Sequence, residues 1–96
     1  MKDDDLDRVF KALGDPTRRR IMDRLRERPR QSLFEICAHA FAEDGVPLSR
    51  QAMTQHLDVL EKAGLVRIEW SGRTKFHTLD SAPLREAAEL WLRNHL

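Results

Sequence analysis

The sequence lacks the features that mark secreted and membrane proteins. Its single cysteine, Cys37, excludes a disulfide within the chain and fits a reducing compartment. No apolar run approaches the roughly 20 residues that a membrane-spanning helix needs. The acidic start at Met1–Asp5 has no apolar stretch of the kind found in signal peptides. We therefore expect a cytoplasmic protein that does not associate with a membrane.

The sequence also lacks the arrangements on which common catalytic sites depend. It has no paired carboxylates at a glycine-rich turn, no nucleophile elbow and no phosphate-binding P-loop. One cysteine and four histidines, scattered over predicted helices and a strand, do not form a convincing catalytic set. We therefore predict a protein that is not an enzyme and needs no cofactor.

Length and charge indicate one small domain with a segregated charge pattern. The 96 residues suffice for a single domain, which we expect to span 1–96. Residues 1–7 hold four aspartates and one lysine, a net charge of −3. Residues 8–30 hold eight arginines and one lysine against three acidic residues, a net charge of +6. This basic segment is either a phosphate-binding patch or a solvated helix face with intrahelical ion pairs.

Apolar residues at helical spacing predict three helices before residue 46. The first helix ends at Gly14, and Asp15–Pro16 begins the second, which stops before Pro29. Ser32–Glu35 has the spacing of a capping box and opens the third helix, which ends at Asp44–Gly45. Leu6, Val9, Phe10 and Leu13 mark the first helix as amphipathic. The second helix carries Ile21, Met22 and Leu25 inward, and the buried stripe of the third is Leu33, Ile36, Cys37, Ala40 and Phe41.

Residues 49–66 predict a fourth helix with two different faces and the start of a strand. Ser49 caps the helix and Gly64 ends it. Met53, Leu57 and Leu60 form an apolar stripe. Amide and hydroxyl groups of the opposite face suit hydrogen bonding to the edges of DNA bases. That face carries Arg50, Gln51, Thr54, Gln55 and Asp58.

Two strands and a last helix complete the predicted order. Leu65–Trp70 alternates apolar and polar residues, and Thr74–Leu79 returns after a glycine-containing turn. Leu79 is out of phase with Phe76, so we expect the second strand to end or bulge there. The last helix begins near Pro83. Along one side it carries Leu84, Ala87, Ala88, Trp91, Leu92 and His95.

The order of four helices, two strands and a helix predicts a mainly α fold with a β-hairpin, a winged helix-turn-helix. The third and fourth helices form the helix-turn-helix, and the hairpin is the wing. The class includes proteins that bind double-stranded DNA. A winged helix that serves only as a protein-interaction module is the alternative, but its exposed helix face would be more apolar.

Several blocks of the sequence resemble the ArsR/SmtB family of bacterial repressors. Residues 11–21, Lys-Ala-Leu-Gly-Asp-Pro-Thr-Arg-Arg-Arg-Ile, are similar to the signature near the family's N-terminus. Residues 49–66 resemble its recognition helix and following strand, and residues 72–76 resemble its wing. With Leu84 and Trp91–Leu92 the resemblance covers almost the whole chain. It implies a homodimeric repressor that pairs through its first and last helices and binds imperfect palindromes.

These considerations select two sets of candidate residues. The residues that we expect to contact bases or phosphates are Arg50, Gln51, Thr54, Gln55, His56, Arg73, Lys75 and Arg19. Apolar stripes on the terminal helices would leave an exposed patch on a monomer, which favours a homodimer. The residues that we expect in that dimer interface are Leu6, Val9, Phe10, Leu84, Ala88, Trp91 and Leu92.

Cys37 and His39 occupy the two positions where metal-sensing relatives carry a Cys-x-Cys pair. Thiolate and imidazole are plausible ligands for soft metals. Zinc sites usually need three or four protein ligands, however, and the chain has no second cysteine. Cys37 also lies on the apolar stripe of its helix, where a free cysteine behaves as a small hydrophobe. We expect no metal site, with a metal- or redox-responsive repressor as the alternative, and the sequence identifies no inducer.

Overall fold

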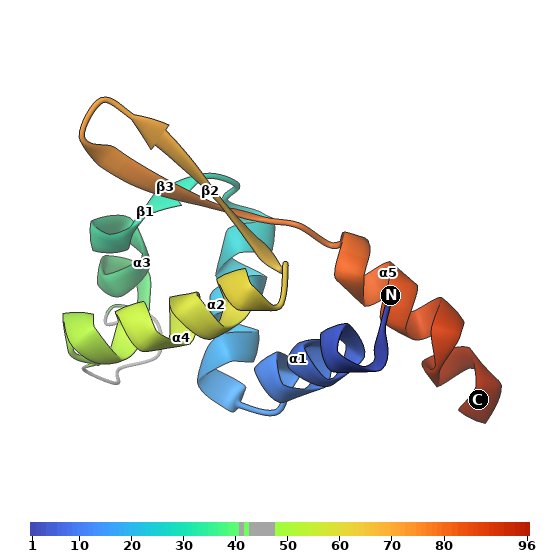
Figure 1. The fold of residues 1–96 in the computed structure, drawn as a ribbon. Coiled ribbons are helices and arrows are strands. Elements are labelled where there is room, and N and C mark those ends of the chain that lie inside the picture. The colour runs from blue at the N-terminus through green and yellow to red at the C-terminus, as the bar shows by residue number, and fades with distance from the viewer. Residues whose placement is uncertain (41, 43–47) are drawn as a thin grey trace.

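The computed structural model describes residues 1–40, 42 and 48–96 (Figure 1). The predicted end of the third helix at 44–45 and the predicted stripe residue Phe41 lie outside the described residues. In chain order the elements are α1 (Asp3–Leu13), α2 (Pro16–Glu27), β1 (Gln31–Ser32), α3 (Leu33–His39), α4 (Arg50–Lys62), β2 (Val66–Ser71), β3 (Thr74–Leu79), α5 (Ala82–Leu90) and the 3₁₀ helix η2 (Leu92–His95).

The fold is a winged helix-turn-helix, which confirms the predicted class. Strands β2 and β3 form an antiparallel hairpin that projects from the helices as the wing (Figure 1). The short strand β1 adds to the hairpin and gives the order β1-β3-β2, with Gln31 opposite His77. Strand β1 was not predicted, because two residues are too few to show an alternating pattern.

The second strand of the hairpin differs from its prediction. We expected it to end or bulge at Leu79, but its pairing is regular to the end, where Leu79 lies opposite Val66. His77 and Leu79 share the inward face, whereas Phe76 points to the other face. There the guanidinium carbon of Arg30 lies 4.2 Å from the centre of the Phe76 ring. The prediction was wrong because it took Phe76 as the inward residue.

The helices and the inner face of the wing enclose one apolar cluster. Helix α4 lies across it and contacts α1, α2, α3 and β2 (Figure 1). Its predicted stripe of Met53, Leu57 and Leu60 is buried. The buried members of the cluster are Ala12, Ile21, Met22, Leu25, Ile36, Ala40, Met53, Leu57, Leu60, Ala63, Leu65 and Val66.

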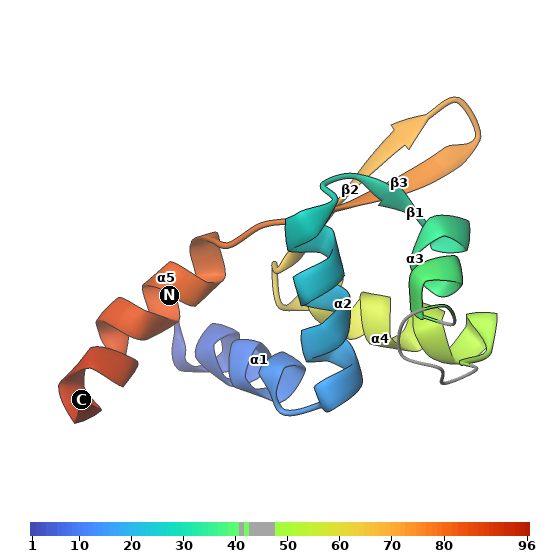
Figure 2. The ribbon, with the colours of Figure 1, turned by 180° about the vertical axis from the view of Figure 1, so that it is seen from behind.

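The last helix is shorter than its predicted stripe. Helix α5 ends at Leu90, and the chain continues from Trp91 as the 3₁₀ helix η2. The Trp91 ring still meets Phe10 of α1 edge to face, with ring centres 5.7 Å apart. Figure 2 shows α1 and α5 side by side at one end of the molecule, away from the wing. Among the described residues, every helix is too short or too polar to cross a membrane.

Candidate nucleic-acid interface

The outer face of α4 is polar and open to solvent. The hydroxyl of Ser49 accepts a hydrogen bond from the Ala52 N–H at 3.0 Å, which caps the helix as predicted. The Thr54 hydroxyl donates to the Arg50 carbonyl at 2.8 Å and keeps lone pairs to accept further bonds. Apolar residues fill the inner face, so the helix presents only its polar side. The exposed residues on it include Arg50, Gln51, Thr54 and Gln55.

A groove of about 580 Å³ separates α4 from the wing. Residues that we predicted as DNA contacts converge on it from two elements, because Arg50 and Thr54 line it from α4 while Arg73 and Lys75 line it from the wing. Gln51 and Gln55 are exposed on α4, but they are not among the residues that line this groove. The structure therefore brings half of the predicted contact set into one groove and leaves the two glutamines on the adjoining surface of α4.

The groove also holds two acidic residues, Asp58 and Glu61. Asp58 forms an ion pair with Lys62 at 2.9 Å. The Asp58 carboxylate accepts a hydrogen bond from Lys62 and attracts its charge, and both effects raise the pKa of Lys62. Because this pair neutralises one of the two carboxylates locally, Asp58 repels an anionic ligand less than a free carboxylate would.

Two exposed aromatic residues at the groove were not predicted from the sequence. Phe34 is 73% exposed on α3, and Trp70 is 64% exposed on β2. Both line the groove. Phe34 lies outside the apolar stripe of its helix, which was an available signal. Trp70 shares the alternation phase of the buried Val66 and the half-buried Ile68, so the pattern placed it on their side of the strand, although the strand has already left the core at that point.

His77 lies at the floor of the groove and is almost completely buried. Its Nδ1 is 3.0 Å from the carbonyl oxygen of Gln31 and donates to it. Burial lowers the pKa of His77 below its ordinary value of 6.5. The Gln31 side chain donates to the carbonyls of Arg24 and Arg28, while its own Oε1 is buried without a hydrogen-bond partner. These contacts fix β1 against the wing.

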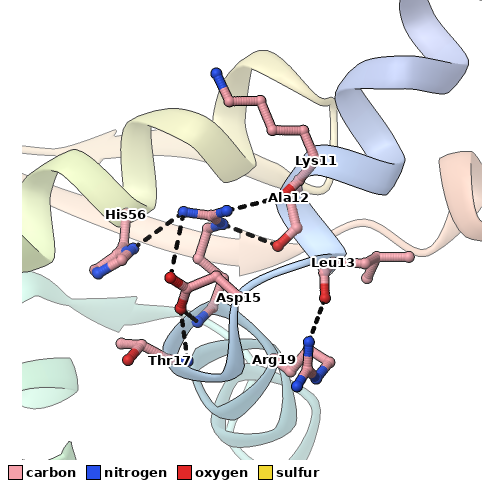
Figure 3. A network of polar contacts seen from close by, with 8 residues as sticks. Lys11, Ala12, Leu13, Asp15, Thr17, Arg19 and His56 are labelled. Carbon is pink, nitrogen blue, oxygen red and sulfur yellow. Dashed lines mark hydrogen bonds and ion pairs between the residues drawn. The ribbon is translucent and has the colours of Figure 1, made fainter.

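Arg19, a predicted phosphate contact, lies at the α1–α2 junction. Its Nη1 donates to the Leu13 carbonyl at the end of α1 (Figure 3). Leu13 has this carbonyl free because Thr17, four residues on, donates its N–H to Asp15 instead. Arg19 remains exposed and keeps other N–H donors, so this contact leaves it able to reach a phosphate.

His56, another predicted contact, is half-buried beside the same junction. Its Nδ1 lies 3.3 Å from Nη1 of Arg18. Arg18 also pairs with Asp15 at 3.9 Å. Partial burial opposes ionisation of the Asp15 carboxyl, but the N–H groups of Arg18 and Thr17 donate to it, and the net effect is a lowered pKa of Asp15.

Cys37 and His39 lie apart from any cluster of metal ligands. Cys37 is half-buried and packs against the apolar cluster, and this burial raises the pKa of its thiol. The Nε2 of His39 lies 3.0 Å from Nη1 of Arg28. Within the described part of the chain, no three histidine, cysteine or acidic side chains are placed to hold a metal ion.

The predicted dimer residues divide into exposed, half-buried and buried groups. Trp91 and Leu92 are exposed, together with Leu90 and Leu96, which the sequence analysis did not select. Val9 is completely buried within the protomer, so its selection as a surface contact was wrong: it faces inward from α1. The half-buried members are Leu6, Phe10, Leu84 and Ala88.

Comparisons with known proteins match this architecture. A family model described as a helix-turn-helix domain matches residues 13–69, which is more than half of the chain. The uncharacterized HTH-type transcriptional regulator YuzN of Bacillus subtilis (strain 168) is 38% identical over 86 residues, which cover 90% of this chain and 94% of YuzN. The transcriptional repressor SdpR of the same organism is 28% identical over 91 residues, or 95% and 92% of the two chains.

Solved structures agree with these relatives. An ArsR-like transcriptional regulator from Rhodococcus sp. RHA1 superposes with a TM-score of 0.74 and 34% identity, over 95% of this chain and 79% of that one. The homodimeric winged helix-turn-helix DNA-binding domain Mb0332 of Mycobacterium bovis has the same fold, with a TM-score of 0.71 and 20% identity over 96% and 80% of the chains. This chain therefore belongs to the ArsR family of winged helix-turn-helix transcriptional regulators.

Proposed function

We propose that this regulator is a homodimeric repressor that acts in the cytoplasm and binds a palindromic operator in double-stranded DNA. Residues 1–96 would act as one DNA-binding domain, with no catalytic activity. The observation that carries the proposal is the convergence of Arg50, Thr54, Arg73 and Lys75 on the groove between α4 and the wing.

Helix α4 is the element that we expect in the major groove. Glutamine side chains pair bidentately with adenine and arginine with guanine, and Gln51, Gln55 and Arg50 are exposed on this helix. Arg73 and Lys75 on the wing would then contact phosphates or the minor groove alongside. The polar character of this face also favours DNA over a purely protein-binding module.

The apolar surface at the α1–α5 end supports a homodimer. Trp91 is 44% exposed and Leu92 is exposed beside it, which is costly for a monomer in water. The Mb0332 domain, which has the same fold, is described as homodimeric. A two-fold dimer would place two copies of α4 about 34 Å apart, one turn of DNA.

The repressor role draws on the relative SdpR, whose name describes a transcriptional repressor. No inducer is part of the proposal. The placement of Cys37 against the apolar cluster supports a packing role for this residue instead of a metal- or redox-sensing one.

The test begins by selecting bound fragments from genomic DNA with the wild-type protein. We expect one palindromic sequence to be enriched, with an affinity that falls steeply as salt rises. Gln55→Ala should relax specificity at defined base pairs, by ~1–3 kcal/mol for a good contact. Arg73→Ala should weaken binding to all sequences evenly and reduce the salt slope by about 1.

Arg85→Ala is the matched control for Arg73→Ala. Arg85 is exposed on α5, away from the wing, and it donates to the Ser81 hydroxyl at 2.8 Å. Its loss removes the same charge and should change operator affinity much less. Equal losses in the two variants, or wild-type binding that does not respond to salt, would contradict the proposal.

A further inference from the structure

We infer that Arg18 is a positioning residue that holds one turn of α4 against the C-terminal end of α1 by way of His56. The expected effect of Arg18 on operator affinity rests on the proposed function, but its expected effect on the tautomer of His56 does not. Figure 3 shows Lys11, Ala12, Asp15 and His56 arranged around one guanidinium group, which is that of Arg18.

The first half of this contact is with the end of α1. Nε of Arg18 donates to the Ala12 carbonyl at 2.9 Å, and Nη2 donates to the Lys11 carbonyl at 2.7 Å. The residue four positions after Ala12 is Pro16, which has no N–H to complete the helical bond. A cation beside these carbonyls also meets the negative end of the helix dipole. The sequence therefore creates an acceptor site that Arg18 fills.

The second half is with α4. Nη1 of Arg18 lies 3.3 Å from Nδ1 of His56 and 3.9 Å from the Asp15 carboxylate. The Arg18 side chain is only 13% exposed, so water can replace few of these contacts if they break. Because the guanidinium is a rigid planar fork, α4 cannot shift relative to α1 without losing at least one bond.

The contact also fixes the protonation pattern of the His56 ring. A guanidinium can only donate, so Nδ1 of His56 must accept and carries no proton. In the neutral ring the proton then lies on Nε2, which points away from the guanidinium (Figure 3). Arg18 thus orients a donor on α4 next to Gln55 in the chain, on the helix that we expect to read DNA.

Arg18 couples the orientation of α4 to the position of α1 because it bonds to groups of both helices. Helix α1 packs beside α5 at the end of the molecule that carries the exposed apolar residues, whereas α4 carries the polar outer face. A bond between them makes the orientation of α4 depend on the position of α1. If α1 pairs with a second copy, Arg18 transmits that placement to the recognition helix without touching DNA.

The direct test is the tautomer of His56, measured by long-range ¹H–¹⁵N NMR at a pH where the ring is neutral. The wild type should show the Nε2–H form. Arg18→Met should show a mixture of both forms, and so should Arg18→Lys, because one ammonium cannot reach both carbonyls and the ring. A wild-type ring in the Nδ1–H form, or an unchanged tautomer in Arg18→Met, would overturn the inference even if the protein binds no DNA.

The functional test is a double-mutant cycle on the dissociation constant for the selected operator. Arg18→Met and His56→Leu should each weaken operator binding by roughly tenfold. Because both substitutions remove the same contact, the dissociation constant of the double variant should lie within about twofold of that of the weaker-binding single variant. If the fold losses in affinity of the two single variants multiply in the double variant, Arg18 and His56 act independently and the inference is refuted.

Arg26→Met is the matched control for loss of charge. Arg26 is exposed on the same helix, α2, and lies outside the Arg18 contacts. It should leave the His56 tautomer unchanged and weaken binding by no more than about threefold. If Arg18→Met fails to fold, the tautomer in Arg18→Lys still decides the question, and a wild-type tautomer in that variant would refute the inference.

Discussion

At the scale of single residues, buried polar groups mark where the wing is attached. His77 donates to the Gln31 carbonyl, and the Gln31 amide in turn donates to two carbonyls at the end of α2 and just beyond it. Buried polar groups of this kind stabilise a fold only when they are paired. The attachment of β1 to β3 therefore depends on one neutral imidazole.

Because His77 is buried, we expect the protein to lose stability in mild acid. Burial lowers the pKa of His77 in the folded protein, so below about pH 6.5 the unfolded chain binds a proton that the folded chain does not. The free energy of unfolding should therefore fall as pH drops from about 6.5 towards the folded pKa. His77→Asn, whose amide nitrogen lies at the position of Nδ1 and can still donate to Gln31, should flatten this dependence in urea titrations.

The control for this prediction is His39→Gln, which leaves His77 in place and should keep the wild-type slope. An identical pH dependence in wild type and His77→Asn would show that another group controls stability in acid.

At the scale of elements, the helix ends are determined by local chemistry. Asp15 accepts from the N–H groups of Thr17 and Arg18 at the start of α2. Ser32 and Glu35 form the predicted capping box on α3, and Ser49 caps α4. Each of these caps satisfies N–H groups that have no partner inside the helix. This is why the start of each of these helices was readable from sequence.

A side chain at Gly64, just after α4 and beside Pro83 of α5, should lower the free energy of unfolding. Gly64 follows α4 with a φ of +76°, and a Cβ there would lie 3.3 Å from Cγ of Pro83. Gly64→Ala should lower the free energy of unfolding by about 1–2 kcal/mol through the backbone alone, plus any cost of moving Pro83. Chemical denaturation measures this directly.

Gly72→Ala is the matched comparison. Gly72 has a φ of +59° in the turn of the wing, and a Cβ there would meet nothing within 4 Å. It should show the backbone cost without the packing cost, so Gly64→Ala should be the more destabilising of the two. A larger effect at Gly72 would contradict the assignment of the Pro83 contact.

At the scale of the whole molecule, the protein presents two ends with different surfaces. The wing and α4 line a groove that holds basic, acidic and exposed aromatic side chains at one end, and α1 with α5 carries an exposed apolar surface at the other (Figures 1 and 2). The separation would let a protein pair through one end and bind DNA through the other.

The proposed homodimer would bury the exposed part of Trp91 in its interface. The Trp91 ring packs against Phe10 with centres 5.7 Å apart and stacks on His95 at 4.0 Å, while 44% of the residue remains exposed. Trp91→Ala should shift the protein towards monomer in sedimentation equilibrium and weaken operator binding, because a buried aromatic contact is among the strongest in interfaces. Trp70→Ala removes an exposed tryptophan from the wing and should leave the dimer intact. Dissociation in Trp70→Ala, or none in Trp91→Ala, would contradict this assignment.

The candidate site was only partly readable from sequence. Arg50, Thr54, Arg73 and Lys75 were selected by residue type and position, and all four line the groove. The exposure of Phe34 and Trp70 was not predicted. Hydrophobic periodicity shows which residues share a face of a helix or strand, but not where that element leaves the core. The arginines after Asp15 were equally ambiguous, since a cation suits both a phosphate and a helix carbonyl.

The sequence by itself determined the family, the order of the main elements and the polar face of α4, because periodicity, capping residues and turn glycines act over a few neighbouring positions. Only the tertiary structure decided which groups meet across the chain. It added β1 to the wing, turned Val9 inward and placed Arg18 between α1 and His56. The pairing of β1 with the wing and the Arg18–His56 contact join residues 46 and 38 positions apart, and no local pattern encodes them.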